Sequence, residues 1–487
     1  MIDLENFKII ISGSTIIPSF NVQIGTGEQW VVTGDSGSGK TSLLHAIAGG
    51  QAHGGKLVFS NTSSQQKLKL VMVEQQHRFR NLSNTSTFYY QQRFNSAGTY
   101  DANTLEQDIK NSLGLQEEDL LPGEALEAIQ WLHIGHLLQT RLIQLSNGEN
   151  KRLQIAKAIL MKPDLLLLDN PLIGLDVEAR ANLTELLKTI IGRGIQLIVA
   201  MSAAEIPDYF THVLVLKKAE SPQVLRLNEF RHTAVKPLER TRRIIAGSLF
   251  EKLVLSAADE TFEIAVRMEN VNIRYEGRKI LDDINWEVRR GDKWAISGAN
   301  GAGKSTLLSL VNADNPQAYA NRIYLFDRKR GSGESIWDIK KKIGFVSPEL
   351  HLFFDSSTNC GEVVASGLFD TVGLFRLLNE QQEALVDEWM QLLEIGHLRV
   401  KGFSRISLSE QRLVLLARAL VKNPPMLILD EPCQGLDDHQ VDYFKNLVNE
   451  ICIRAGKTLL YVSHYKPEIP ACVDKFLRLD AGKIVTD

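Results

Sequence analysis

Short apolar runs alternate along the chain with glycine-rich turns and stretches of helical periodicity. The run Leu165-Leu166-Leu167-Leu168 lies between two aspartates, and Lys293-Trp294-Ala295-Ile296-Ser297 is followed at once by a glycine-rich segment. Apolar runs of this length between turn residues are typical of strands buried in a parallel sheet. After the glycines, Leu307-Leu308-Ser309-Leu310 begins a predicted helix. The pattern predicts an α/β fold.

The pattern occurs twice. Gly27-Glu28-Gln29-Trp30-Val31-Val32-Thr33-Gly34 matches a segment that ends at Gly298, and Pro163 to Asp169 matches Pro424 to Asp430. Such self-similarity indicates a tandem duplication of one α/β unit. We expect a first domain over 1–220, a surface linker over 221–262 with room for a short helix, and a second domain over 263–487. A basic cluster at Arg240-Thr241-Arg242-Arg243 is interpreted as a surface feature of this linker, with a nucleic-acid or partner contact as the alternative.

Each repeat carries a phosphate-loop pattern, G-x-x-x-x-G-K-[ST], between a predicted strand and a predicted helix. Its glycines let successive backbone N–H groups turn inward, and the helix N-terminus adds positive potential where phosphates bind. We expect Lys304 to reach the terminal phosphates and Ser305 to ligate Mg²⁺. The predicted phosphate-binding residues are Gly34, Ser36, Gly37, Gly39, Lys40, Thr41 and Ser42 in the first repeat, and Gly298, Asn300, Gly301, Gly303, Lys304, Ser305 and Thr306 in the second.

Each long apolar strand ends in an aspartate, Asp169 or Asp430, which we expect to face the phosphate loop and hold Mg²⁺. In the second repeat Glu431 follows, a carboxylate that could polarise an attacking water. In the first repeat the same position is Asn170. An amide cannot accept a proton, so we expect that site to lack its general base.

Composition narrows the possible partners. The chain has 487 residues, 44% hydrophobic and 23% charged, with a net charge of −3, which does not favour broad nucleic-acid binding. We expect no sequence-specific nucleic-acid partner. No signal peptide is visible, and no window approaches the roughly 18 apolar residues that span a bilayer. Any membrane part must therefore come from other chains. The four cysteines match no metal-binding spacing and are expected to be reduced thiols.

A third motif precedes each Asp-ended strand: Leu145-Ser146-Asn147-Gly148-Glu149 in the first half and Ile406-Ser407-Leu408-Ser409-Glu410 in the second. With the phosphate loops and Asp-ended strands in this order, the chain resembles the ATP-binding-cassette (ABC) ATPases over nearly its whole length. The resemblance implies a P-loop NTPase fold of ABC type, with two nucleotide-binding domains, each with an α/β core and a helical subdomain. It also implies head-to-tail pairing, with each ATP between the phosphate loop of one half and the signature motif of the other.

The resemblance assigns further roles. His464 matches the family's switch histidine, with Met201 opposite it in the first half, and Tyr275 matches the adenine-stacking aromatic, with Ile11 as its counterpart. Gln75 belongs to the glutamine loop and is expected at the metal. In the second half Pro348 takes the place of this glutamine, and Glu349 is the alternative candidate for its role. The family's D-loop, which follows the Asp-ended strand, matches Gly174-Leu175-Asp176 and Gly435-Leu436-Asp437.

Grouped by composite site, these residues divide unequally. One site joins nearly every expected part: Lys304, Asp430, Glu431, His464 and Tyr275 with Ser146 and Gly148. The other joins Lys40, Thr41 and Asp169 to a second signature motif in which Ser409 replaces a glycine. We therefore expect the first of these sites to hydrolyse ATP and the second mainly to hold it.

Aromatic segments lie between the phosphate loop and the signature motif of each half: Phe88 to Phe94, Leu352-Phe353-Phe354 and Leu374-Phe375. We interpret them as part of a groove that receives a membrane permease; the alternative is that they are buried core residues. The stretch Gly331 to Lys340, with Gly298 to Thr306 and Ile343 to Val346, resembles the ModF-type tandem ATPases associated with molybdate transport in bacteria. This favours an energy-coupling subunit of a membrane transporter, cytoplasmic or peripheral on the inner face of the plasma membrane. The alternative is a non-transport ATPase acting on ribosomes or in a regulatory or repair role.

Overall fold

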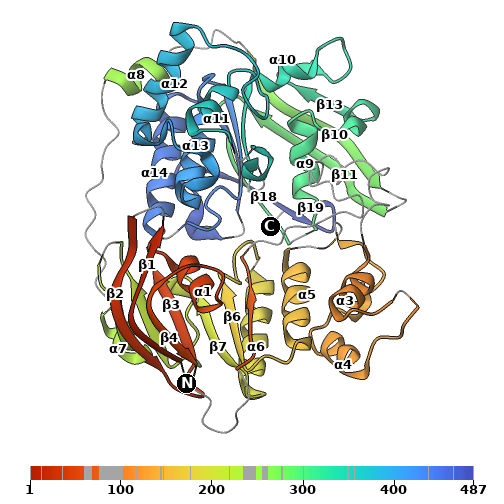
Figure 1. Cartoon of the computed structure of the whole chain (residues 1–487). Helices are drawn as coiled ribbons and strands as arrows, with labels where there is room; N and C mark the ends of the chain where they lie inside the picture. Colours follow the sequence, from red (N-terminus) through yellow and green to blue (C-terminus); the bar gives the residue numbers. More distant parts are fainter. Residues whose placement is uncertain are drawn as a thin grey trace. The chain divides into compact units, whose positions relative to one another are not determined.

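The computed structural model describes residues 2–11, 14–35, 37–59, 68–75, 103–116, 118–142, 145, 147–175, 177–218, 220–233, 248–254, 262–275, 278–299, 301–347, 350–355, 357–436, 438–463 and 465–485. The chain divides into two compact units, Met1–Thr241 and Arg242–Asp487. Each unit is an α/β structure, as the repeated pattern predicted (Figure 1).

The first unit is built around a six-stranded sheet in which the strand with the phosphate loop is third from one edge. Its order is β5 (Leu70–Val73), β6 (Leu165–Asp169), β7 (Gln196–Ala200), β3 (Trp30–Gly34), β8 (His212–Leu216) and β9 (Gln223–Arg226). Neighbouring strands from β5 to β8 run parallel, and β9 closes the edge antiparallel to β8. The carboxyl ends of β3 and β6 therefore lie at the same edge of the sheet, which brings the phosphate loop and Asp169 together.

Both faces of this sheet are covered because alternate residues of each strand point to opposite sides. One face packs on α1 (Lys40–Ile47) and a smaller antiparallel sheet of β2 (Ser14–Ile24), β1 (Ile2–Ile11) and β4 (Gly54–Phe59). The other packs on a helical core that includes α5 (Asn147–Leu160) and α6 (Val177–Gly192), and Figure 1 shows α3 (Leu105–Leu113) and α4 (Gly123–Trp131) beyond α5. Leu165 and Leu167 enter the first core, and Leu166 and Leu168 enter the second.

The second unit repeats this plan. Its parallel sheet has the order β15 (Ile343–Val346), β16 (Met426–Asp430), β17 (Thr458–Val462), β12 (Lys293–Ser297), β18 (Lys475–Asp480) and an antiparallel β19 (Lys483–Val485). One face carries α9 (Lys304–Val311) and a sheet of β11 (Arg278–Arg289), β10 (Ile264–Tyr275), β13 (Arg322–Leu325) and β14 (Arg328–Lys329).

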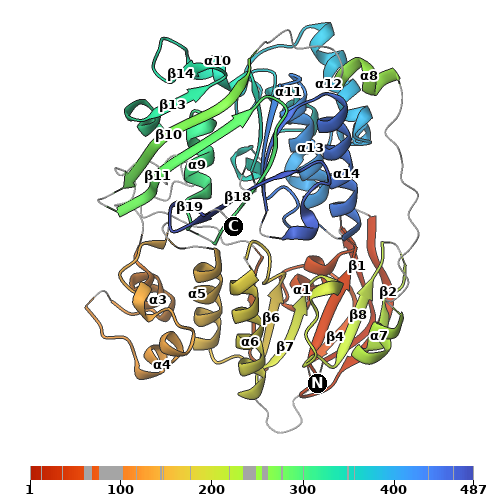
Figure 2. The same ribbon diagram turned by 180° about the vertical axis from the view of Figure 1, so that it is seen from behind.

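The opposite face of the second sheet is helical (Figure 2). Its core holds residues of α11 (Cys360–Ser366), α12 (Glu380–Leu392), α13 (Leu408–Leu420) and α14 (Asp438–Arg454), and α10 (Ile336–Lys340) precedes β15 in the chain. Helix α13 starts where the sequence places the signature motif, because Ser407 caps it: its hydroxyl accepts from the backbone N–H of Glu410, whose side chain bonds back to the Ser407 N–H.

The segment 221–262, expected to be a linker, carries secondary structure at both ends. Strand β9 and α7 (Leu227–Thr233) belong to the first unit, and Phe230 packs against its helical core. Helix α8 (Ser248–Val254) buries Phe250, Leu253 and Val254 in the second unit. The boundary between the units lies at Thr241–Arg242, so the described ends of this segment belong to the units.

None of the helices in the described ranges is long and apolar enough to cross a bilayer. The four cysteines are free thiols, of which Cys472 alone is only partly buried.

Candidate nucleotide sites

Both phosphate loops have the backbone that their glycines permit. Gly34 and Gly298, at the ends of β3 and β12, have φ of 143° and 145°. A Cβ atom there would lie 1.9 Å from the Leu216 carbonyl oxygen and 2.2 Å from that of Leu479. Positive φ recurs at the other loop glycines of both units, with matching values at Gly37, Gly301, Gly39 and Gly303. The described glycines of the two loops therefore have the same backbone conformation.

The loop lysines take the same position in the two units. The Lys40 ammonium donates to the carbonyl oxygens of Gly34 (2.6 Å) and Asp35 (2.9 Å). The Lys304 ammonium donates to Gly298 (2.7 Å) and Ala299 (3.0 Å). Each lysine begins the helix that follows its loop, so its charge lies at a helix N-terminus, where anions bind. Ser42 and Thr306 follow in these helices, Thr306 buried; Ser36 and Asn300 lie outside the described residues.

In the first unit the helix hydroxyl and the strand carboxylate meet. The Thr41 hydroxyl donates to Asp169 Oδ2 at 2.8 Å. Asp169 is 2% exposed, and burial raises the pKa of its carboxyl group, while the Thr41 hydrogen bond and the charges of His45, Lys151 and Lys40 oppose that rise. In the second unit Ser305 is likewise the second residue of its helix, and Asp430 ends β16.

Immediately after each aspartate, the backbone of the two units is again the same. Asn170 has φ of 43° and donates its N–H to the Ala200 carbonyl at 2.9 Å. Glu431 has φ of 41° and donates to the Val462 carbonyl at 3.0 Å. The difference between these positions is therefore in side-chain chemistry and not in backbone shape.

Gln75 lies beside Asn170, whose amide Nδ2 donates to Gln75 Oε1 at 3.4 Å and to Asp169 Oδ1 at 2.9 Å. The structure thus brings the glutamine loop and the end of β6 together. Asn170 also satisfies the Asp169 carboxylate with a donor, which a carboxylate at this position could not supply while ionised.

Buried cations of the signature helices α5 and α13 also lie at these sites, and the sequence analysis did not assign them a role. Lys151 is 5% exposed and donates to the carbonyl oxygens of Glu74 (2.9 Å) and Gln75 (3.1 Å). Arg412 is 2% exposed and donates to the Ser347 carbonyl oxygen (3.3 Å). A charged residue in an otherwise apolar helical stripe was the available signal, but only the folded packing shows that both are buried.

The remaining predicted residues are dispersed. Tyr275 ends β10, is half-buried against the core, and accepts a hydrogen bond from Asn315 Nδ2 at 2.8 Å. Burial raises the pKa of its hydroxyl, and the Asn315 hydrogen bond opposes the rise. Gly148 is buried in α5, where a Cβ would lie 3.3 Å from that of Ala179. Met201 is buried in the core of the first unit. Ser146, His464, Pro348, Glu349, Asp176, Asp437 and the stretch 88–94 lie outside the described residues.

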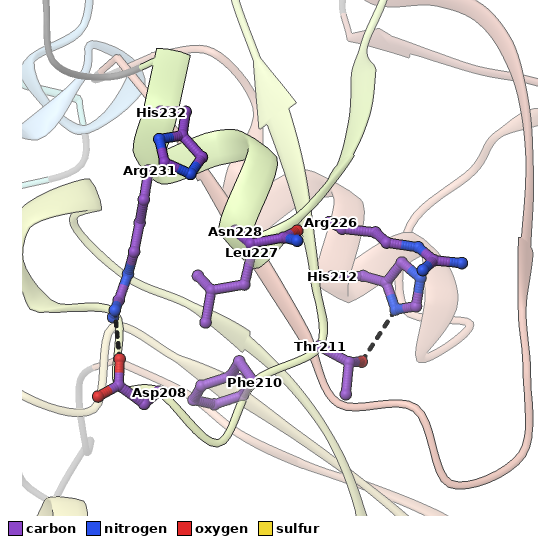
Figure 3. A pocket seen from close by; sticks show the side chains of 9 residues that line it. All are labelled: Asp208, Phe210, Thr211, His212, Arg226, Leu227, Asn228, Arg231 and His232. Atoms are coloured by element: carbon purple, nitrogen blue, oxygen red, sulfur yellow. Dashed lines mark hydrogen bonds and ion pairs between the residues drawn. The ribbon is translucent and has the colours of Figure 1, made fainter.

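Within the described part of the first unit there is also an open pocket of about 610 Å³, shown in Figure 3. His212 lines it at the amino end of β8, where it pairs with Trp30, whereas Gly34 pairs with Leu216 at the other end. Four residues of strand span about 13 Å, so this pocket is separate from the phosphate loop. Its Arg231 is ion-paired with Asp208, and His212 is hydrogen-bonded to Thr211.

Comparison with known proteins agrees with this geometry. The family model described as "ABC transporter" matches residues 17–173 and, a second time, 281–434. ABC transporter ATP-binding protein ModF of Escherichia coli (strain K12) is 35% identical over 92% of this chain and 91% of its own length. An uncharacterized ABC transporter ATP-binding protein of Schizosaccharomyces pombe is 31% identical over 96% of this chain and 96% of its own length. One of Saccharomyces cerevisiae is 29% identical over 72% of this chain and 71% of its own length.

Both halves carry the matching loops and Asp-ended strands, and the family model covers most of each. The chain therefore belongs to the ABC transporter family, as a tandem ATP-binding protein with two ATPase domains of the P-loop type.

Proposed function

We propose that this chain hydrolyses ATP at one of two unequal composite sites and thereby drives a membrane transporter. The hydrolytic site joins the second-half residues Lys304, Asp430, Glu431 and His464 to the first-half signature at Ser146 and Gly148, with the two halves paired head to tail. The other site, at Lys40, Thr41 and Asp169, mainly holds ATP. The observation that carries this inequality is that Asn170 and Glu431 have the same backbone conformation and hydrogen bond, while only the glutamate side chain can accept a proton.

The donor set suits Mg²⁺ in addition to ATP. A hydroxyl oxygen beside a carboxylate is the kind of oxygen pair that holds Mg²⁺ against nucleotide phosphates, and Thr41 and Asp169 form such a pair. A divalent cation would also offset the burial of the Asp169 carboxylate, which by itself favours the protonated form. Ser305 and Asp430 would take the same roles in the second half.

The second-half signature supports the same inequality. The Ser407 hydroxyl donates to Glu410 Oε2 at 2.7 Å and lies 3.1 Å from the Ser409 hydroxyl. A side chain thus occupies the place where the first signature has Gly148, which keeps the backbone at Ser409 further from any phosphate. In the hydrolytic site, Glu431 would polarise the attacking water while Lys304 binds the terminal phosphates.

The test is steady-state ATPase activity of two single variants. We expect Glu431→Gln to lower kcat at least about 100-fold, because general-base assistance contributes about 10²–10⁴ in rate. Asn170→Ala should stay within a few-fold of the wild type. A comparable loss of kcat in both variants would show that the two sites contribute equally to hydrolysis, which contradicts the proposal.

The transport role draws support from the surface of the second unit. In the loop between α11 and α12, Phe375 is 79% and Leu377 99% exposed, whereas Phe354 is buried and Phe353 and Leu374 pack against the core. The aromatic segments thus divide between core and surface, and the exposed pair lies in the region that we expect to meet a permease. That role would hold the chain on the cytoplasmic face of a membrane. The association with molybdate stays a prediction.

The competing function is a non-transport tandem ATPase acting on ribosomes or in regulation or repair. Affinity purification from the native cell separates the two. Co-purification of a membrane permease, lost in a Phe375→Ser, Leu377→Ser variant, supports transport. Co-purification of ribosomal proteins without a permease supports the rival.

A further inference from the structure

The buried arginine of helix α13 lies where three elements of the second unit converge: α13 itself, the loop after β15 and the end of β16. Its guanidinium Nη1 donates to the Ser347 carbonyl oxygen at 3.3 Å. Ser347 directly follows β15, and β15 pairs with β16 so that Val346 lies opposite Leu429. The next residues along β16 are Asp430 and Glu431. Arg412 therefore joins the signature helix to the backbone that runs alongside the acidic end of β16.

The first unit has the same arrangement with a different cation. Lys151 lies 261 residues before Arg412, the same interval that separates Asp169 from Asp430. Its ammonium binds the Glu74 and Gln75 carbonyls, which follow β5, and Val73 lies opposite Leu168. Two halves of different sequence thus keep a buried cation at one place, between the signature helix, the loop after the edge strand and the strand aspartate.

Burying these cations is costly. Burial lowers the pKa of Arg412 to about 10, although the negative charges of Glu431, Cys433 and Asp430 oppose the fall. Burial likewise lowers the pKa of Lys151 to about 8, although the charge of Asp169 opposes the fall. A well-packed apolar side chain is often as stable as a buried charge or more so. The charge is therefore better explained by its action on the carbonyl and carboxylates around it than by a need of the fold.

We propose that Arg412 is a positioning residue for hydrolysis: it ties the loop after β15 to the signature helix and so fixes the backbone beside the end of β16, from which Glu431 acts. In the first unit, Lys151 binds the loop after β5 in the same way. There the residue after the strand aspartate is Asn170, so no carboxylate is present to be positioned. This inference rests on the proposed function, in which Glu431 carries the hydrolytic step.

The test compares charge-removing and charge-keeping variants of the full chain by ATPase kinetics, per folded molecule. Arg412→Met is expected to lower kcat about 10- to 100-fold while KM for ATP stays within about threefold, because a poorly placed base slows chemistry more than it weakens binding. Arg412→Lys should recover most of kcat, since the first half uses lysine at this place. An unchanged kcat in Arg412→Met, or an Arg412→Lys variant as slow as Arg412→Met, would overturn the proposal.

Arg418 gives a matched control on the same helix. It is 7% exposed and bonds to the Ser366 hydroxyl (3.1 Å) and the Thr371 carbonyl (3.0 Å), away from the end of β16. Arg418→Met should lower stability and leave kcat per folded molecule unchanged; an equal fall in kcat would mean that any buried arginine of α13 has this effect, which contradicts a positioning role. Where Arg412→Met does not fold, Arg412→Gln replaces it, because glutamine keeps a donor for Ser347 without the charge.

Glu431→Gln in the same series separates this inference from the proposed function. If Glu431→Gln keeps wild-type kcat, the proposed function fails and the positioning role falls with it. If Glu431→Gln is inactive while Arg412→Met is fully active, only the role of Arg412 is refuted.

Discussion

At the turn after each Asp-ended strand, residues 170 and 431 enter the left-handed region of φ, which asparagine tolerates better than most residues. Holding glutamate in that conformation costs about 1–3 kcal/mol, a strain of the kind found at functional sites. The two halves thus share a strained backbone and differ in the group that it presents.

The residue scale also gives a stability prediction at the phosphate loop. Gly298→Ala places a Cβ against the Leu479 carbonyl at a φ of 145°. We expect the free energy of unfolding to fall by about 1–3 kcal/mol, with loss of ATP binding, because the loop must distort. Urea denaturation and equilibrium ATP binding measure the two effects.

Gly301→Ala is the matched control, because that position has positive φ but nothing within 4 Å of a new Cβ. Its loss of stability should be the smaller of the two. Equal losses would mean that backbone conformation alone, without the clash at Leu479, explains the effect.

At the scale of elements, the two described ends of the segment 221–262 carry secondary structure, and the sequence shows part of the reason. Leu249, Phe250, Leu253 and Val254 already have helical spacing in the sequence, but a seven-residue helix is too short to stand out from a surface segment. Its stability comes from packing against the helical core of the second unit, which the sequence does not show.

Phe250→Ala tests that assignment. Phe250 is 1% exposed, and the Arg454 guanidinium lies 4.2 Å from the centre of its ring. Removing a buried aromatic side chain should lower the free energy of unfolding of the second unit by about 3–5 kcal/mol. Glu251→Ala, an exposed neighbour on the same helix, should cost under about 1 kcal/mol. Thermal denaturation monitored by tryptophan fluorescence measures the loss of stability in each variant. If Phe250→Ala leaves the stability unchanged, helix α8 is not part of the core of the second unit.

The phosphate loops and the Asp-ended strands could be predicted because each motif is short and its strand and helix adjoin it in the sequence. The positions of Lys151 and Arg412 could not, because a charge on a helix usually faces solvent and its burial depends on the neighbouring loop. Burial also could not be predicted for Phe354 and Phe375, although each lies in a short apolar segment that begins with leucine. Phe354 is buried and Phe375 is exposed.

At the scale of the whole molecule, duplication followed by unequal substitution is the main feature. The two units keep the same order in their six-stranded sheets, the same conformation at the described loop glycines and a buried cation, while the first has Asn170 and Met201 and the second has Ser409. Because the scaffold is the same in both, we interpret the substitutions as a division of labour in which one ATP is held and the other is hydrolysed.

The number of ATP molecules cleaved in one turnover tests this division most directly. The full chain is loaded with radiolabelled ATP and Mg²⁺, trapped after a single turnover with vanadate, quenched, and its bound nucleotides are separated. We predict one ADP and one intact ATP per chain, with the ADP lost in Glu431→Gln and kept in Asn170→Ala. Two ADP per chain, or ADP that persists in Glu431→Gln, would contradict the account.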